Sequence, residues 1–276
     1  IKGKALYPKM EILFRMMQEI LMESRLDDEK RLKEILAMLK SRLQMSFQSS
    51  GHTTAALRAL SYSSPISKFK DDTDGIGYYQ AVKEAEEHFE EQKETLIQNL
   101  KEIASHIFRW DNLMVSLTCG EEGLDAVCRE LSGMKDRLYA AGEKEESRCI
   151  LHCTKQNEGF KTSSKVQYVA RVGNFIDGGA DYSGTLQILK VILSYGYLWQ
   201  NIRVKGGAYG CMCNFNRIGE GYLISYRDPN LEKTMEVYEG VVDYLKNFTV
   251  NDRDMNKYII GTISNIDRPM TPSAKG

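Results

Sequence analysis

Apolar residues recur at helical spacing through the first half of this 276-residue chain. Between Leu6 and Met22 they stand at positions 10, 13, 14, 17, 20 and 21, which is the stripe of an amphipathic helix. A second stripe, from Leu32 to Leu43, follows three acidic residues of the kind that favour a helix N-terminus. Gly51 ends that helix, and a shorter alanine-rich helix follows to about Tyr62. The pattern predicts a helix-rich first half.

Turn-forming residues separate these helices from the next group. Residues 63–65 and 71–75 are rich in Ser, Pro, Asp and Gly, which predicts loops. A helical pattern then covers 78–108, with room for two helices, and a further helix is predicted over 120–139. Between these two stretches, the run Asn-Leu-Met-Val-Ser-Leu-Thr at 112–118 predicts a strand.

Strands and helices mix in the C-terminal part of the chain. One strand is predicted over 165–172, and the runs at 208–215 and 221–226 predict an antiparallel pair that turns at 217–220. Helices are predicted over 183–203, 231–248 and 251–268. The fold class is therefore α+β, with an antiparallel sheet packed against helices.

The polar segment 141–164 shows no hydrophobic period, and we expect it to be a linker. It separates a helix-rich domain at 1–140 from a second domain at 165–276. Two domains also agree with the length of the chain.

Charge and hydropathy exclude several classes of function. The chain has 37 Lys and Arg against 38 Asp and Glu, a net charge of −1, so it lacks the cationic excess of a nucleic-acid-binding protein or a polybasic membrane anchor. The longest apolar run, 186–193, is interrupted by Gln187 and Lys190, so no membrane-spanning helix is expected. We therefore expect neither nucleic acid nor a membrane as a partner.

The six cysteines favour free thiols in a reducing compartment, because the chain is large and begins without a secretory signal. We expect a cytoplasmic protein. The first residues, Ile-Lys-Gly-Lys, also lack an initiator Met, which suggests a chain taken from a longer protein.

Potential metal ligands fall into three small groups, and none has the spacing of a common zinc site. His88 is followed by Gln92 where the His-x-x-Glu-His motif needs a second histidine. Cys149, His152 and Cys153 form the second group, and Cys211 with Cys213 the third. We interpret these as a solvated helix face and as buried or half-buried thiols, and we predict no metal site in this chain.

The most informative stretch for chemistry runs from Tyr197 to Gly210. A helix is expected to end near Arg203, Gly206 and Gly207 reverse the chain, and Tyr209 begins a strand. This order brings a guanidinium and a phenol together at one end of a sheet. Both groups can donate hydrogen bonds to a peptide carbonyl or an oxyanion. Spacing alone favours a structural interpretation, in which Arg203 is a charge at the C-terminus of a helix and Tyr209 packs in the sheet. The chain has no Gly-x-Ser-x-Gly motif, and its Gly-Gly pair lacks the Lys-Ser/Thr of a phosphate loop.

Five segments carry a resemblance to a known family. They are 50–62, 166–175, 197–210, 225–230 and 258–276, the third with the pattern Arg-x5-Tyr around Gly-Gly-Ala. In these the chain resembles the presequence protease branch (M16C) of the insulinase- and pitrilysin-like zinc metallopeptidases. The likeness extends over essentially the whole chain.

The resemblance implies a clamshell of two halves, each with two related α+β domains of the M16 (LuxS/MPP-like) kind, around a chamber for unfolded peptides. Zinc would sit in the N-terminal half, on His-x-x-Glu-His. The C-terminal half would supply Arg203 and Tyr209 to bind substrate and stabilise the transition state, with Gly206 and Gly207 beside them. This chain would be the latter part of the third domain and most of the fourth, truncated at its C-terminus. Its expected partners are the zinc-binding half of the same polypeptide and peptide substrates.

The chain departs from the family pattern because it contains no His-x-x-Glu-His. We therefore expect zinc to be a cofactor of the parent enzyme only, and the isolated chain to be inactive. Two other interpretations stay open: a catalytically inactive homologue with a structural or assembly role, and a helical interaction module within 1–110. The latter predicts an exposed apolar seam.

Overall fold

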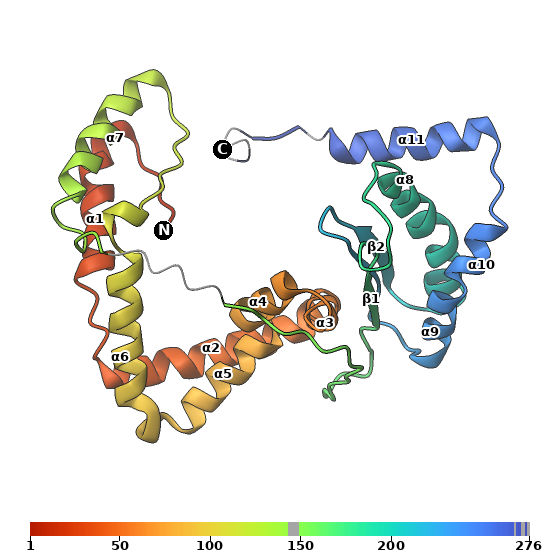
Figure 1. Ribbon diagram of the computed structural model, residues 1–276, viewed down its shortest axis with the longest axis horizontal. Coiled ribbons are helices and arrows are strands. Elements are labelled where there is room, and N and C mark those ends of the chain that lie inside the picture. The colour runs from red at the N-terminus through yellow and green to blue at the C-terminus, as the bar shows by residue number, and fades with distance from the viewer. Residues whose placement is uncertain (143–148, 268, 272–273, 275–276) are drawn as a thin grey trace. The chain divides into compact units, whose positions relative to one another are not determined.

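The computed structural model describes residues 1–142, 149–267, 269–271 and 274 (Figure 1). The chain divides into two compact units. Unit 1 comprises residues 1–37, 84–148 and 269–276, and unit 2 comprises residues 38–83 and 149–268. Helices α2 (Glu29–Ser49) and α5 (Ile76–Glu87) run from one unit into the other.

Unit 1 is helical where it is described. Its elements are a 3-10 turn at Tyr7–Lys9, α1 (Met10–Met22), α6 (Phe89–Ile107), a second 3-10 turn at Trp110–Asn112, and α7 (Glu121–Met134). Helices α1 and α7 pack together through a buried cluster of Met10, Phe14, Val127 and Met134. The helices predicted from periodicity around these residues are confirmed. The helical stretch predicted over 78–108 is also confirmed, and it forms two helices, α5 and α6.

The strand predicted over 112–118 is wrong. After the 3-10 turn, residues 113–120 have no regular structure, and Met114 is 92% exposed. An apolar run becomes a strand only when a neighbouring strand satisfies its backbone groups. Within the described residues, no strand pairs with this segment.

Unit 2 begins with a helical hairpin, α3 (Gly51–Leu60) and α4 (Pro65–Asp74). The sequence predicted loops at 63–65 and 71–75. The first is confirmed at Ser63 and Ser64, which connect α3 to α4, whereas the second is wrong because residues 71–74 belong to α4. Ser64 caps the helix by accepting a hydrogen bond from the Ser67 N–H, and Pro65 occupies the first turn, where its missing N–H is harmless. The acidic run at 71–74 is the last turn of the helix, since the Asp71 carboxylate accepts hydrogen bonds from the backbone of Ile76 and Gly77.

Three antiparallel strands form the sheet of unit 2, in the order β1-β3-β2. They are β1 (Ala170–Asn174), β2 (Gly210–Phe215) and β3 (Glu220–Tyr226). Gly210 lies opposite Tyr226, and Ala170 opposite Ile224. The predicted β2–β3 pair is confirmed, whereas β1 begins later than the predicted 165.

Helices surround this sheet (Figure 1). Helix α8 (Thr185–Ile192) continues as a π-helix, Leu193–Val204, and both contact β2, while α3 contacts β1 and β3. The chain then forms α9 (Glu232–Glu239), α10 (Val241–Lys246) and α11 (Asp252–Ile266). The core between π-helix, sheet and α9 is a cluster of eight buried residues: Val169, Leu193, Leu198, Ile202, Ala208, Cys211, Cys213 and Tyr238. The α+β class is confirmed.

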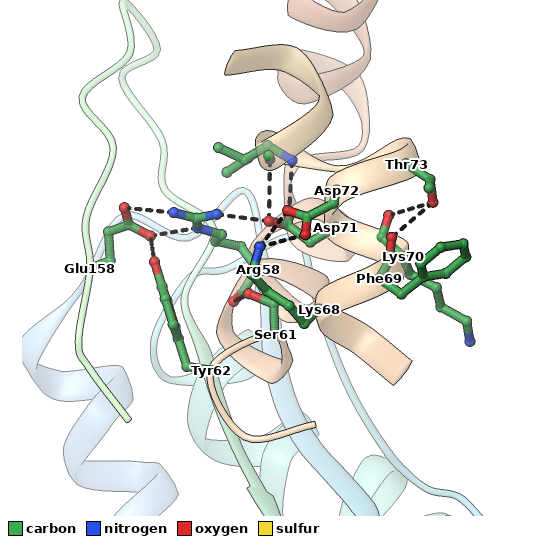
Figure 2. Close-up of polar contacts among 12 residues, drawn as sticks. Arg58, Ser61, Tyr62, Lys68, Phe69, Lys70, Asp71, Asp72, Thr73 and Glu158 are labelled. Atoms are coloured by element: carbon green, nitrogen blue, oxygen red, sulfur yellow. Dashed lines mark hydrogen bonds and ion pairs between the residues drawn. The ribbon is translucent and has the colours of Figure 1, made fainter. Parts of the chain in front are cut away.

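The described parts of the predicted linker, 141–142 and 149–164, have no regular structure, yet the second part is fixed to the hairpin of unit 2. Arg58 on α3 donates hydrogen bonds to both Glu158 and Asp71, and the Tyr62 hydroxyl donates to Glu158 (Figure 2). The compact units thus interleave along the sequence, while the assignment of 1–140 and 165–276 to two family domains stays a prediction.

Two general expectations can be compared with the structure. All six cysteines are free thiols. Among the described helices, none combines the length and apolar character needed to cross a bilayer.

Candidate functional site

The structure brings Arg203 and Tyr209 together at one end of the sheet. Arg203 lies in the last turn of the π-helix, and Tyr209 immediately precedes β2. The Arg203 guanidinium carbon lies 5.3 Å from the centre of the Tyr209 ring. One guanidinium nitrogen also donates a hydrogen bond to the Tyr209 carbonyl. The juxtaposition predicted from helix–glycine–strand order is therefore present.

Gly206 and Gly207 make the sharp turn between them, each for a different reason. A Cβ atom on Gly206 would lie 2.5 Å from the Ile202 carbonyl oxygen, so a side chain does not fit. Gly207 has a φ of +79°, in the left-handed region that glycine adopts without strain. The Asn230 side chain donates a 2.6 Å hydrogen bond to the Gly206 carbonyl, which anchors the turn.

The guanidinium of Arg203 lies against two aromatic rings. Its carbon is 4.7 Å from the ring of Trp199, one helical turn earlier, in addition to its contact with Tyr209. Trp199, Arg203, Tyr209 and Arg227 line one pocket with a volume of about 530 Å³. Cation–π contacts of this kind hold a guanidinium in place while its edge stays free to donate hydrogen bonds.

Tyr209 is held by its backbone and by a neighbouring ring. Its N–H donates to the carbonyls of Tyr226 (3.0 Å) and Arg227 (3.3 Å), and its ring meets Tyr226 edge-on at 5.7 Å. The side chain itself is 66% exposed, and no protein acceptor in the described chain engages its hydroxyl. Because the Tyr209 backbone is held in place while its hydroxyl has no protein acceptor among the described residues, the hydroxyl is suited to donate a hydrogen bond to a ligand.

Behind this pair, Tyr226 packs against two further rings. The ring centres of His52 and Tyr168 lie 4.8 and 5.7 Å from that of Tyr226. Gly51 makes room for this packing, because a Cβ there would lie 2.2 Å from the Tyr168 ring. Burial lowers the pKa of His52, whose Nδ1 is buried without a partner in the described chain. The neutral imidazole is thus part of an apolar support for the site.

The cysteines nearest the site are poor nucleophiles. Cys211 and Cys213 both point from β2 into the core. Burial, together with the proximity of Cys213, raises the pKa of Cys211 to about 11 despite the opposing charge of Arg203. The thiol therefore stays protonated at neutral pH. The interpretation of this pair as buried thiols is confirmed.

The other candidate ligands are His88 in unit 1 and Cys149, His152 and Cys153 in unit 2. His88 is the N-cap residue of α6 but makes no side-chain capping hydrogen bond, and its Nδ1 lies 3.6 Å from a carboxylate oxygen of the exposed Glu91. Cys149 is exposed and Cys153 half-buried. Within the residues that the structure describes, no three side chains of the His, Cys, Asp and Glu types gather to hold a metal ion.

Two residues of the pocket were not singled out from the sequence. Trp199 lies in the stretch 197–210 and Arg227 in 225–230, both of which carry the family resemblance, but neither residue was assigned a role from the sequence. Arg227 is a backbone exception: it has a φ of 49°, the only positive φ of a non-glycine residue in the described chain. Arginine has no preference for this conformation, so the sequence carries no signal for it.

Two protein-family models match this chain. The model described as the PreP C-terminal domain matches residues 157–276, and the one described as Peptidase M16C associated matches residues 1–84. The chain therefore carries regions similar to the PreP C-terminal domain and to the domain associated with M16C peptidases. The first match includes the whole of β1–β3 and the pocket of Arg203 and Tyr209.

Several relatives match the chain over its entire length. Protein HypA of Clostridium perfringens is 37% identical over 277 aligned positions, which are 100% of this chain and 28% of the relative. Presequence protease 1, chloroplastic/mitochondrial, of Arabidopsis thaliana is 28% identical and covers 100% of the chain and 26% of the relative. The mitochondrial presequence protease of Yarrowia lipolytica is 27% identical over 99% of the chain and 28% of the relative.

The chain thus spans about a quarter of the length of the relatives that it matches. The relatives from Arabidopsis and Yarrowia carry organelle names, and the predicted cytoplasmic location of this chain stays a prediction.

Proposed function

We propose that this chain is the non-zinc, C-terminal part of a zinc-dependent metalloendopeptidase that degrades unfolded peptides in a closed chamber. The observation that carries the proposal is the Arg203–Tyr209 pair, which lines one pocket and in which the Tyr209 side chain is 66% exposed. The similarity to the PreP C-terminal domain and to relatives named presequence protease supports the reaction class. The remaining part of the site would come from the N-terminal half of the same polypeptide.

The two side chains have complementary donors for a peptide carbonyl. One N–H of Arg203 is used by the Tyr209 carbonyl, and the others have no protein acceptor in the described chain. These N–H groups and the Tyr209 hydroxyl would bind the carbonyl next to the scissile bond. They would then strengthen their hydrogen bonds as that oxygen gains negative charge. Their contribution is greatest in a closed chamber, because excluding water strengthens such interactions.

Zinc does not fit the residues of this chain. The described residues lack a cluster of three potential ligands, and the full sequence lacks His-x-x-Glu-His. The metal of the proposed enzyme would therefore be held by its other half, and the 276 residues alone should not hydrolyse peptides.

The alternative, an inactive homologue with a structural role, does not explain why Arg203 and Tyr209 have hydrogen-bond donors without protein acceptors in the described chain. A scaffold needs neither a guanidinium without a carboxylate partner nor a phenol that is 66% exposed. The helical-module interpretation of 1–110 is disfavoured by the structure, because residues 38–83 belong to the compact unit that contains the sheet.

The test is turnover of an unstructured peptide by the full-length protein that contains this chain. Arg203→Ala should lower kcat/KM by about 10²- to 10³-fold, and Tyr209→Phe, which removes one donor, by about 10²-fold. The zinc content of both variants should equal that of the wild type. Arg171→Ala is the matched control, because Arg171 is a sheet arginine on β1 that pairs with Glu239 instead of lining the pocket.

Unchanged turnover of the Arg203 variant would refute the assigned role. A full-length wild-type protein that binds zinc but never cleaves peptide would favour the inactive homologue.

A further inference from the structure

The pocket of Arg203 and Tyr209 contains a second guanidinium, from Arg227. This residue directly follows β3 and is exposed. Its guanidinium carbon lies 5.5 Å from the centre of the Tyr226 ring, which in turn contacts Tyr209. Two arginines from different elements, the π-helix and the end of β3, therefore line one cavity.

The backbone at Arg227 is held in an unfavourable conformation by its neighbours. Its φ of 49° brings Cβ close to the backbone, and only special contexts keep a bulky residue there. On one side, the carbonyls of Tyr226 and Arg227 accept the Tyr209 N–H. On the other, Asp228 exchanges two backbone hydrogen bonds with Gln167. The fold thus fixes Arg227 at the pocket although glycine would fit this backbone better.

Charge around the two guanidinium groups is unbalanced. In the described part of the chain, no carboxylate forms an ion pair with Arg203 or Arg227. The nearest acidic residue in sequence, Asp228, is fully buried and accepts hydrogen bonds from the Asn230 N–H (2.9 Å) and the Thr234 hydroxyl (2.7 Å). Its carboxylate is therefore engaged within the loop.

Two unpaired guanidinium groups beside aromatic walls form a receptor for an anion. A carboxylate matches the planar, forked donors of arginine, and its charge would relieve the repulsion between two cations. The indole of Trp199 and the ring of Tyr209 supply apolar contact for the chain that bears it.

We propose that Arg227 is a substrate-binding residue that recognises a carboxylate on the peptide held by Arg203 and Tyr209. This inference rests on the proposed function and adds a specificity to it. The carboxylate is either the C-terminus of the peptide or an Asp or Glu side chain, and the two sources can be separated by experiment.

The experiment uses the 276-residue chain with Trp110→Phe, so that Trp199 becomes its only tryptophan. Three N-acetylated tetrapeptides are titrated against its fluorescence: Ala-Leu-Ala-Ala with a free C-terminal carboxylate, the same peptide amidated, and the amidated peptide Ala-Leu-Glu-Ala. We expect at least one carboxylate peptide to bind about tenfold more tightly than the neutral one, as charge-assisted hydrogen bonds imply. Which of the two gains affinity identifies the source.

Arg227→Gln should abolish that preference, so that the three peptides bind with equal affinity, whereas Arg203→Gln should weaken binding of all three peptides. Arg227→Gly is the second variant. It relieves the positive φ and cannot fail to fold through strain, yet it should lose the preference equally.

Retention of the preference in both Arg227 variants would overturn the inference, and so would equal binding of the three peptides, or no binding, in the wild-type background. The proposed function would survive either result, because turnover and the Arg203→Ala variant of the full-length protein decide it separately.

Discussion

Two arginines of unit 2 lie in similar aromatic surroundings but differ in their counterions. The guanidinium of Arg58 lies 5.1 Å from the Tyr62 ring and 5.9 Å from the Phe160 ring, and that of Arg203 lies 4.7 Å from Trp199 and 5.3 Å from Tyr209. Arg58 contacts two carboxylates, Asp71 at 2.7 Å and Glu158 at 2.7 Å. Within the described residues, Arg203 has no carboxylate partner, and its guanidinium donates a hydrogen bond to the Tyr209 carbonyl.

The counterions explain what each arginine can do. The hydrogen bonds of Glu158, followed by those of Asp71, raise the pKa of Arg58 and occupy its donors, so this side chain joins α3, α4 and the segment before β1 (Figure 2). Arg203 keeps donors for a ligand. A guanidinium that lies on aromatic rings thus has a structural role when carboxylates accept its hydrogen bonds, and it remains available to bind a ligand when no carboxylate does.

The largest expected effect comes from making the same substitution at both arginines. Arg58→Met should destabilise unit 2 by about 3 kcal/mol, because it leaves the Asp71 carboxylate, which is 0% exposed, without its cation. Arg203→Met should change stability by less than about 1 kcal/mol, since no buried charge loses a partner. Urea unfolding monitored through Trp199, with Trp110→Phe in both variants, measures the difference.

Equal destabilisation by the two substitutions would contradict the conclusion that Arg58 is structural and Arg203 is not. Circular dichroism of the Arg58 variant before urea is added controls for a unit 2 that is already unfolded.

Glu158→Gln sharpens the comparison with a smaller effect, about 1–2 kcal/mol, because hydrogen bonds to the amide replace charge-assisted ones. The hydrogen bond from Arg58 holds the pKa of Glu158 below its ordinary value of 4.5. The folded state therefore binds this proton more weakly than the unfolded state. The stability contribution is fully present above pH 4.5 and is lost as the pH falls through the lower folded-state pKa.

Unfolding free energies measured from pH 7 down to pH 3 should consequently converge for the wild type and Glu158→Gln. Curves that stay parallel over this range would show that Glu158 is not ionically coupled to Arg58.

Gly207 tests the turn that presents Arg203. Because its φ is +79° and a Cβ would have only ordinary contact with Pro229 at 3.7 Å, substitution affects the backbone alone. Gly207→Ala should cost about 1 kcal/mol, and Gly207→Asn less, since asparagine tolerates the left-handed region better. Thermal unfolding of the two variants checks the order, and a larger loss for Asn would contradict it.

The sequence was most informative where local signals and packing agree. Periodicity located α1 and α2, and the helix-start signal at Asn251 located α11. Two strand-like runs located the β2–β3 hairpin, and the glycine pair located the turn at Gly206. The segment 112–118 failed because its alternation has no partner strand, and α4 failed because its acidic last turn resembles a loop. The spacing of hydrophobic residues along the chain does not specify which residues that are distant in sequence come into contact.

The same limit holds for the site. The juxtaposition of Arg203 and Tyr209 follows from local order along the chain, and it was predicted. The contact of Arg58 with Glu158 joins residues 100 positions apart, and the positive φ of Arg227 is imposed by its neighbours in space. Neither leaves a mark in the surrounding sequence.

His52 shows how a titratable group behaves when burial brings no counterion, and here the smallest effect is expected. Burial lowers its pKa from 6.5, so the folded protein binds this proton more weakly than the unfolded chain. The contribution of neutral His52 to the unfolding free energy is therefore fully present above pH 6.5 and declines as the pH falls toward the folded-state pKa. His52→Asn should flatten the pH dependence of the unfolding free energy in that window, measured by urea unfolding at a series of pH values. The opposite result would be an unchanged pH dependence in His52→Asn. It would mean that the protonated His52 of the wild type donates a hydrogen bond to an acceptor near Tyr226, so that the support behind Tyr209 is polar instead of apolar.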